Sequence, residues 1–486
     1  MPLTLHNTLT KKTEVFTPLS GNHVTLYTCG PTVYHYLTVG NWTAYIYWDI
    51  LVRTLRADGY DVTRVMNITD VGHLVSDEDE GEDKLEKGAK REGKTAWEIA
   101  KFYADDFKAG MKKLNMIAPE YLTPATEYIP QQLDLVRTLK EKGYTYQITD
   151  GIYFDSSKFP TYADFAGLDL AAQRAGARVE FNPEKRNPSD FALWKFTPKG
   201  TKRDMEWETP GDLLDPPSKK KVMGFPGWHI ECSAMAMNLL GETIDIHTGG
   251  IDHIPVHHTN EIAQSESASG KQFARYWVHS NHIKVNGTKI SKSLGNGYTL
   301  QDLAKKHFEP MDLRMLILQG QYSNEGNFTF ENLTAAKNRL HNWRNMAALR
   351  HQTYDTIDSD DDKEVVLVAA RSAMLEALND NLNTPEALRI VDESFSRLDR
   401  VTSINQHGLL EMLEAIDELL GLNLLGTTPD IDDNTKAIIV KRERAREEKD
   451  WALSDQLRDE LAEKHHITVR DTASGTIWEY AEKKSR

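Results

Sequence analysis

The amino-acid sequence predicts an α/β protein that begins with a parallel sheet split by an insertion and continues into an all-α bundle and a small α+β domain. Three observations lead to this fold class. A strand–helix–strand pattern fills the first 75 residues, a helical period follows position 325, and a charged helical stretch with a hairpin pattern closes the chain. At 486 residues, the chain is long enough for about three domains.

The first elements form a βαβ unit of the kind that opens Rossmann-type sheets. Residues 24–29 alternate as a strand does, and a Gly-Pro pair ends the run. Residues 44–55 carry large apolar side chains at helical spacing, and a second strand is expected over 62–68. Ligands bind at the carboxyl ends of parallel strands, so Cys29 lies where a site is expected.

The middle of the chain contains two interruptions. Residues 76–94 are rich in Asp, Glu and Lys and are expected to form a solvated excursion. Residues 120–210 mix Pro, Gly and aromatic residues, with strand-like runs at 151–155 and 191–195. We interpret this second segment as the insertion that divides the sheet domain.

The C-terminal third is helical before a short mixed domain. A linker at 426–433 precedes a charged helical stretch at 436–464, and strands at 467–471 and 476–479 are expected to form a hairpin. The domains predicted by these patterns are residues 1–119, 120–210, 211–325, 326–425 and 430–486.

Composition excludes several classes of protein. With 40% hydrophobic and 27% charged residues, a mean hydropathy of −0.54 and no long apolar run, the sequence predicts a soluble cytoplasmic protein without a membrane partner. Two cysteines cannot form a disulfide framework and are typical of a reducing compartment. A net charge of −15 argues against non-specific coating of nucleic acid, so any polyanionic partner must meet local basic surface.

Two cysteines, a histidine and a glutamate form the first candidate site. Cys29 ends a strand, Cys232 lies in a Pro-Gly-Trp-His-Ile-Glu-Cys run, and His257 and Glu261 share one helix face at i, i+4. Two thiolates, an imidazole and a carboxylate are a set that zinc accepts; we call these four residues the ligand quartet. The alternative is that both cysteines are ordinary buried apolar residues.

A lysine-rich loop at 289–293, Lys-Ile-Ser-Lys-Ser, forms the second candidate site. Lys289 and Lys292, with a serine between them, can bring cations and a hydroxyl donor onto a triphosphate. A phosphate or adenine can dock at the helix N-terminus near Thr38-Val-Gly-Asn41, about 250 residues earlier. The alternative is a basic surface loop without a ligand.

Five ordered motifs carry a resemblance to a known family. The segments are Cys-Gly-Pro-Thr-Val-Tyr at 29–34, Asn-Ile-Thr-Asp at 67–70, the Pro-Gly-Trp run at 226–232, His-His-Thr-Asn-Glu at 257–261 and the loop at 289–293. Over nearly its full length the chain resembles class I aminoacyl-tRNA synthetases, and specifically the bacterial cysteinyl-tRNA synthetase family. The resemblance implies a Rossmann-type catalytic domain, a helical bundle and an anticodon-binding domain.

The resemblance implies one zinc ion on the ligand quartet, with the substrate thiolate bound to the metal. Serine differs from cysteine by one atom, and a thiophilic ion turns that difference into a bond, so no editing domain is required. Residues expected around the amino acid are Cys29, Thr69, Trp228 and His247.

The family's reaction runs in two steps and needs ATP with Mg²⁺. The carboxylate of L-cysteine attacks the α-phosphorus of ATP, and the terminal ribose of tRNA(Cys) then accepts the cysteinyl group. Neither step needs a protein nucleophile, so Lys289 and Lys292 would act by holding phosphates. Residues expected at ATP are Thr38, Gly40, Asn41, Gly249, Gly250, Asp252, Lys289, Ser291 and Lys292.

One position departs from the family pattern. Thr38 stands where the first signature tetrapeptide usually begins with histidine. A hydroxyl donates a hydrogen bond but cannot carry the charge of an imidazolium, so stabilisation at the phosphates is either weaker or supplied by a neighbour such as His35. This departure keeps open a non-catalytic paralogue that binds tRNA or nucleotide.

The C-terminal segment is similar to the family's anticodon-reading domain. Cationic side chains on the charged stretch can contact phosphates, and a tryptophan in the hairpin can stack on an unpaired base. The alternative is a solvated helix and a hairpin core tryptophan. Residues considered for tRNA are Arg442, Arg444, Arg446, Asp455 and Trp478.

A second rival function is a ligase that joins cysteine to an amino sugar by the same adenylate chemistry. Such paralogues share the core motifs but are shorter, and the segment from about residue 430 argues against this function. The family resemblance also suggests a monomer.

Overall fold

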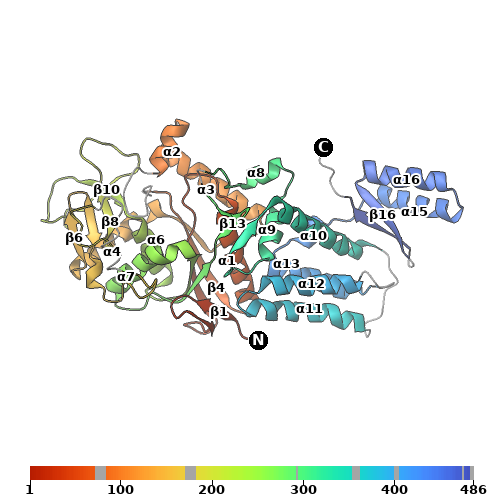
Figure 1. Ribbon diagram of the computed structural model, residues 1–486, viewed down its shortest axis with the longest axis horizontal. Coiled ribbons are helices and arrows are strands. Elements are labelled where there is room, and N and C mark those ends of the chain that lie inside the picture. Colours follow the sequence, from red (N-terminus) through yellow and green to blue (C-terminus); the bar gives the residue numbers. More distant parts are fainter. Residues whose placement is uncertain are drawn as a thin grey trace.

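The computed structural model describes residues 1–71, 84–169, 182–291, 294–352, 362–398, 404–472 and 475–481. The molecule is elongated, with an antiparallel sheet at one end, a parallel sheet and helical bundle in the middle, and the C-terminal domain at the other end (Figure 1). Residues 76–83 of the charged segment at 76–94 lie outside the described residues. Residues Lys84–Glu92 form the helix α2, and its Leu85 and Ala89 are buried, so this part is not a solvated excursion. Within the described part of the chain, no helix is long and apolar enough to cross a bilayer.

The central sheet has five parallel strands in the order β12-β11-β3-β4-β5. Helix α1 (Val39–Ala57) connects β3 to its neighbour β4, which confirms the expected βαβ unit. The strands are β3 (His23–Thr28), β4 (Asp61–Ile68), β5 (Tyr121–Pro124), β11 (Ile244–Gly250) and β12 (Ala274–Ser280).

The insertion forms its own antiparallel sheet, in the order β6-β7-β8-β10-β9. Its bounds differ from the prediction of 120–210, because β5 still pairs with β4 of the central sheet, and the last strand of the insertion sheet, β10, pairs with β8 beyond residue 210. The strands are β6 (Thr145–Ile148), β7 (Gly151–Phe154), β8 (Phe191–Phe196), β9 (Trp207–Glu208) and β10 (Met223–Pro226).

Helices cover the two sheets and connect them. Helix α6 packs beside α4, α7 and β8, which joins the insertion to the central sheet. In Figure 1, α2 and α3 extend along the upper edge of the molecule. The helices of this half are α2 (Lys84–Glu92), α3 (Ala96–Lys113), α4 (Ile129–Glu141), α6 (Trp228–Leu240) and α7 (Thr259–Ser269).

Smaller elements join the sheet domain to the bundle. Strand β13 lies between β14 and β15 in a three-stranded sheet, and β1 pairs with β2 in a separate hairpin. Their bounds are β1 (Thr4–Asn7), β2 (Lys12–Val15), β13 (Ile283–Val285), β14 (Thr288–Lys289) and β15 (Gly326–Phe328). The helices that follow are α8 (Leu300–Lys305), α9 (Pro310–Leu318), α10 (Phe330–Ala348), α11 (Asp362–Asn379), α12 (Thr384–Leu398), α13 (Gln406–Leu420) and α14 (Leu424–Thr427).

The C-terminal domain consists of two helices and a hairpin. The stretch at 436–464 was expected to be a single helical segment, but it is two helices, because the chain turns at Lys449, whose φ of 61° is not helical. The antiparallel hairpin is confirmed, with Val469 opposite Trp478. The elements are α15 (Asp433–Glu447), α16 (Trp451–Lys464), β16 (Ile467–Thr472) and β17 (Gly475–Tyr480).

A buried ion cluster connects the sheet domain to the bundle. Asp49 of α1 accepts from Arg53 at 2.7 Å and from Arg314 of α9 at 2.5 Å, and all three side chains are at most 8% exposed. Burial alone would raise the pKa of Asp49, but the two guanidinium groups hold it below its usual range. Arg314 also donates to the carbonyl of Leu420, and a Cβ at Gly421 would lie 2.7 Å from Cζ of Arg53.

We expect Asp49→Asn to lower the free energy of unfolding by about 3–5 kcal/mol, because it leaves two buried guanidinium groups without a counter-charge. Glu242→Gln is the matched control, since Glu242 and its partner Lys271 are exposed, and it should leave the free energy of unfolding nearly unchanged. Urea unfolding monitored by circular dichroism measures both. If Asp49→Asn lowered the free energy of unfolding as little as Glu242→Gln does, the buried ion cluster would contribute little to stability.

Candidate metal and nucleotide site

The ligand quartet converges at the carboxyl end of the central sheet. Cys29 follows β3, Cys232 lies in α6, His257 lies in a π-helical turn at Ile254–His258, and Glu261 lies in the first turn of α7. All four are buried, and their ligand atoms lie within 4.8 Å of one another. His257 Nε2 lies 2.9 Å from Glu261 Oε1. The donor set and its spacing fit a tetrahedral metal ion such as zinc.

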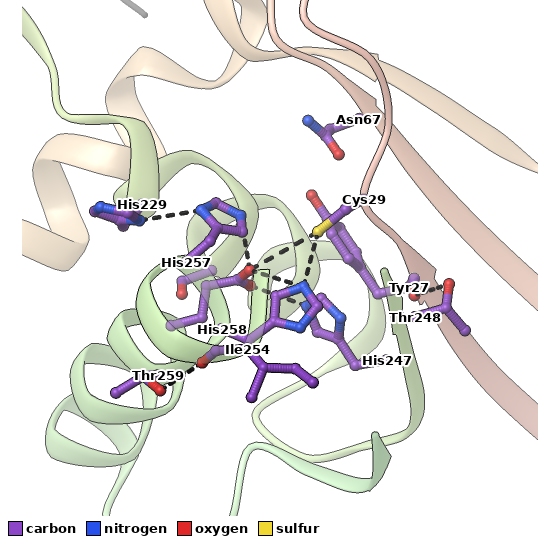
Figure 2. A network of polar contacts seen from close by, with 12 residues as sticks. Tyr27, Cys29, Asn67, His229, His247, Thr248, Ile254, His257, His258 and Thr259 are labelled. Atoms are coloured by element: carbon purple, nitrogen blue, oxygen red, sulfur yellow. Dashed lines mark hydrogen bonds and ion pairs between the residues drawn. The ribbon is translucent and has the colours of Figure 1, made fainter. Parts of the chain in front are cut away.

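Three further histidines surround the quartet (Figure 2). Nδ1 of His229 lies 3.0 Å from Nδ1 of His257, and Nε2 of His247 lies 3.0 Å from Glu261 Oε2. Nε2 of His258 lies 3.3 Å from Sγ of Cys29. Hydrogen bonds of this kind orient metal ligands. The group Cys29, His247, His258 and Glu261 also has ligand atoms within 4.8 Å.

The pKa shifts within the quartet favour an ionised Cys232 and Glu261 beside a protonated Cys29 and His257. Burial disfavours the thiolate, but contacts with Cys29 and His257 lower the pKa of Cys232 to about 6. Burial and the neighbouring Cys232 raise the pKa of Cys29. Burial also opposes ionisation of Glu261 and His257, yet His247 and His257 together lower the pKa of Glu261 to about 2. Glu261 and Cys232 raise the pKa of His257 to about 10. A divalent cation would therefore displace protons when it binds.

A cavity of about 320 Å³ opens above His257. Trp228, the first residue of α6, lines this cavity and stacks on His257 with ring centroids 4.4 Å apart. His35 lines it as well, with its Nδ1 3.1 Å from the carbonyl oxygen of Tyr36. The complete lining is Pro31, Thr32, Tyr34, His35, Tyr36, Leu37, Asn41, Trp228, Asp252, His253, Val256 and His257.

Thr69 and His247, the other two residues expected around the amino acid, are both buried. Thr69 donates to Glu231 Oε2 at 3.1 Å and accepts from Asn67. His247 stacks on Trp277 at 4.3 Å and contacts Glu261. His247 therefore contacts a residue of the quartet, and Thr69 contacts the Pro-Gly-Trp run that contains Cys232.

The two signature segments meet despite 250 intervening residues. Thr38 precedes α1, and its backbone N–H and hydroxyl both donate to Oδ1 of Asn41 at 2.9 Å. A Cβ at Gly40 would lie 2.9 Å from Cδ1 of Ile290, so the glycine gives this side chain of the lysine loop room to pack against α1. The contact places the loop beside the N-terminus of α1, where Asn41 lines the cavity.

The lysine loop continues from β14. Lys289 is exposed at the end of that strand, and the backbone N–H of Ser291 donates to Oδ1 of Asn296 at 2.9 Å. Lys292 lies outside the described residues. Asn296 also donates to the carbonyl of Lys289, so this side chain holds both sides of the loop.

The glycine turn expected at ATP lies beside the same cavity. Gly249 and Gly250 end β11, and Asp252 lines the cavity from the turn that follows. Gly249 pairs with His279 on the neighbouring parallel strand β12, so the glycine turn lies at the carboxyl end of the sheet, as Cys29 does.

The C-terminal domain corrects two sequence-based predictions. Trp478 is only 5% exposed and packs in a core with Ile439, Leu461 and Ile467, so it offers no free face to a base. Arg442 is also buried and forms two hydrogen bonds to Asp471.

The other residues considered for tRNA remain at the surface. Arg444 is exposed, Arg446 is partly buried and pairs with Asp471, and Asp455 pairs with Arg458. Sequence reasoning missed Trp451, which is 56% exposed and lies 5.7 Å from the guanidinium of Arg446. Its place directly after the N-cap residue Asp450 was the available signal, because that position often points to solvent.

Sequence reasoning also missed His229, His258 and Glu231. All three are fully buried beside the quartet. His229 and Glu231 flank Ile230 in the Pro-Gly-Trp run, and His258 follows the ligand His257. The signal was their immediate sequence proximity to the proposed ligands.

Two family models match the chain. The model described as the class I (C) tRNA synthetase catalytic domain matches residues 15–338, and the model of the cysteinyl-tRNA ligase anticodon-binding domain matches residues 428–478. The chain is 39% identical to a cysteine–tRNA ligase of Treponema denticola, covering 98% of this chain and 99% of the relative. It is 41% identical to cysteine–tRNA ligase 1 of Burkholderia lata, covering 98% and 96%.

Solved structures share the fold at low sequence identity. A methionyl-tRNA synthetase of Mycobacterium tuberculosis in complex with methionyl-adenylate aligns with a TM-score of 0.58 at 16% identity, over 84% of this chain and 93% of that one. A LeuRS–tRNA–LeuAMS complex from Agrobacterium radiobacter aligns with a TM-score of 0.60 at 12% identity, over 84% and 85%. Taken with the family matches, the chain belongs to the cysteine–tRNA ligase family of class I tRNA synthetases.

Proposed function

We propose that this chain activates L-cysteine with ATP and transfers the cysteinyl group to the 3′-terminal ribose of tRNA(Cys). The main support for this proposal is that the ligand quartet lies beside a cavity that is also lined by Asn41 and Asp252, two residues expected at ATP. Two thiols, an imidazole and a carboxylate form a donor set that suits a thiophilic metal, and the adjoining cavity can receive a small amino acid.

We assign the metal to zinc, held by Cys29, Cys232, His257 and Glu261. When bound, zinc supplies a Lewis-acidic partner for the substrate thiolate, which serine cannot match. Trp228 closes the side of the amino-acid site by stacking on His257. His247 and His229 orient the carboxylate and the imidazole through hydrogen bonds at 3.0 Å.

The proposed adenylation step depends on positioning and charge. The carboxylate of cysteine attacks the α-phosphorus, the bond to the bridging oxygen breaks, and pyrophosphate leaves with Mg²⁺. The exposed Lys289 and its loop neighbour Lys292 would neutralise the leaving phosphates. Backbone groups near Gly40 and at Gly249 would approach the nucleotide, and Asp252 is available to accept a hydrogen bond from the ribose.

The two rival functions lose support for different reasons. A ligase for an amino sugar has no use for an anticodon-binding domain, yet residues 428–478 match one. A non-catalytic paralogue would not need Ile290 of the lysine loop packed against the helix at Gly40. The presence of Thr38 therefore argues for altered efficiency rather than for loss of the reaction.

Cys232→Ser should lower bound zinc and remove the preference for cysteine over serine, because the hydroxyl is a harder and weaker ligand. We expect ATP–pyrophosphate exchange with cysteine to fall at least about 100-fold, in line with the loss of a metal ligand and its oriented substrate. Metal content by atomic absorption and exchange with both amino acids measure this. Normal discrimination in a metal-free variant would contradict the assignment.

Thr38→His should raise the rate of ATP–pyrophosphate exchange about tenfold, because an imidazolium forms a charge-assisted hydrogen bond where the hydroxyl forms a neutral one. His35→Ala provides the comparison, since His35 lines the same cavity. Should His35 already supply the missing charge, its loss would slow exchange and the Thr38 change would have little effect.

Trp451→Ala should raise the KM for tRNA about tenfold and leave ATP–pyrophosphate exchange unchanged, because base stacking on an exposed aromatic ring is worth about 1–3 kcal/mol. Trp478→Ala is the contrasting variant. It removes a core side chain, so it should lower the stability of the C-terminal domain in a thermal melt. Identical effects of the two changes on folding would contradict a binding role for Trp451.

A further inference from the structure

Four aromatic side chains form an open surface at the rim of the cavity, which we call the aromatic platform: His35, Tyr36, Phe102 and Tyr103. Tyr36 meets Phe102 with ring centroids 6.0 Å apart and Tyr103 at 5.1 Å, both edge to face. His35 lies parallel to Tyr103 at 6.2 Å. His35 and Tyr36 line the cavity, so the platform continues directly from the site.

His35 and Phe102 give the platform a solvent-exposed face. Phe102 is 43% exposed and His35 is exposed, whereas Tyr103 beneath them is buried. Tyr103 donates to Glu92 at 3.0 Å, which fixes the platform to the C-terminal end of α2. An exposed phenylalanine held in place at the entrance of a site is available to stack on a planar group.

Cations accompany the platform. Residues 87–94 carry four Lys or Arg side chains and one carboxylate, in a chain whose formal net charge is −15. Glu92 accepts from both Arg91 and Lys94, and Nζ of Lys94 lies 4.9 Å from the centroid of Phe102. The stretch thus places positive charge beside a stacking surface in an otherwise acidic protein, which suits a polyanion with unpaired bases.

We propose that the aromatic platform binds the unpaired 3′-terminal nucleotides of tRNA and guides the end of the chain into the cavity, with Phe102 stacking on a base and Lys94 facing a phosphate. This inference rests on the proposed function, which requires the 3′ end to reach the adenylate. Unpaired RNA ends are recognised by stacking on aromatic side chains, and their phosphates by nearby cations. Phe102, which does not line the cavity, acts on the transfer step and leaves amino-acid activation untouched.

Helix α3 supplies a matched pair of variants. Phe102→Ala removes the exposed ring of the platform. Trp97→Ala removes a ring that is 46% exposed on the same helix but faces the insertion, where it meets Trp207 at 6.3 Å and donates to the carbonyl of Asp204. Phe102→Trp retains a stacking surface and serves as the rescue.

The test compares ATP–pyrophosphate exchange without tRNA, aminoacylation of tRNA(Cys), and binding of the same tRNA with and without its unpaired 3′ nucleotides. We expect Phe102→Ala to lower kcat/KM for tRNA about tenfold and to leave exchange and binding of the truncated tRNA unchanged. Trp97→Ala should resemble wild type, and Phe102→Trp should restore most of the loss.

Any of three results would contradict the proposed role of the platform. Phe102→Ala could charge tRNA(Cys) at the wild-type rate, or Trp97→Ala could lose as much kcat/KM for tRNA as Phe102→Ala does. The third such result is that Phe102→Ala binds the truncated tRNA more weakly than wild type does. Failure of the proposed function has a different signature: wild-type protein that exchanges pyrophosphate but does not charge tRNA, or that does neither. The platform would then fall with the function on which it rests.

Discussion

The buried contact of Asp49 with Arg53 and Arg314 holds the nucleotide-binding half of the protein against the helical bundle. Asp49 lies on α1, whose N-terminus carries Thr38, and Arg314 lies on α9 of the bundle. Both arginines also donate to carbonyl oxygens at the end of α13. A charge removed from water is tolerated only when it is paired and hydrogen-bonded, so this arrangement admits few alternative positions for α1.

The position of α1 in turn determines the geometry of the site. The N-terminus of α1 approaches the lysine loop through Gly40 and Ile290, and β3 beside it delivers Cys29 to the end of the sheet. The remaining ligands come from α6, the π-helical turn at Ile254–His258 and α7, which pack on one another. Opposite charges on Glu261 and His257 partly compensate the burial of the quartet. The candidate metal ligands and the lysine loop therefore share one rigid support, as the proposed reaction requires.

Sequence patterns predicted the central features because those features are local or encoded by residue type. The alternation before Cys29 and the helical spacing after it specified the βαβ unit, which β3, α1 and β4 confirm. Side-chain chemistry made the quartet a candidate metal set, the family resemblance implied the metal, and the four groups do lie together. The boundary of the insertion was wrong because β5 is four residues long, and its place beside β4 is a long-range pairing without a periodic signal.

By itself, the sequence determined the chemistry that this protein can perform: which donors it offers a metal, which cations it offers phosphates, and which segments are strands or helices. Tertiary structure decided which of two tryptophans is exposed. Trp478 faces inward because its hairpin packs on the end of α10, where its backbone contacts Gln352, whereas Trp451 begins α16 and points to solvent. The physical reason is that burial depends on which surfaces dock, and docking is a property of distant residues that no local pattern records.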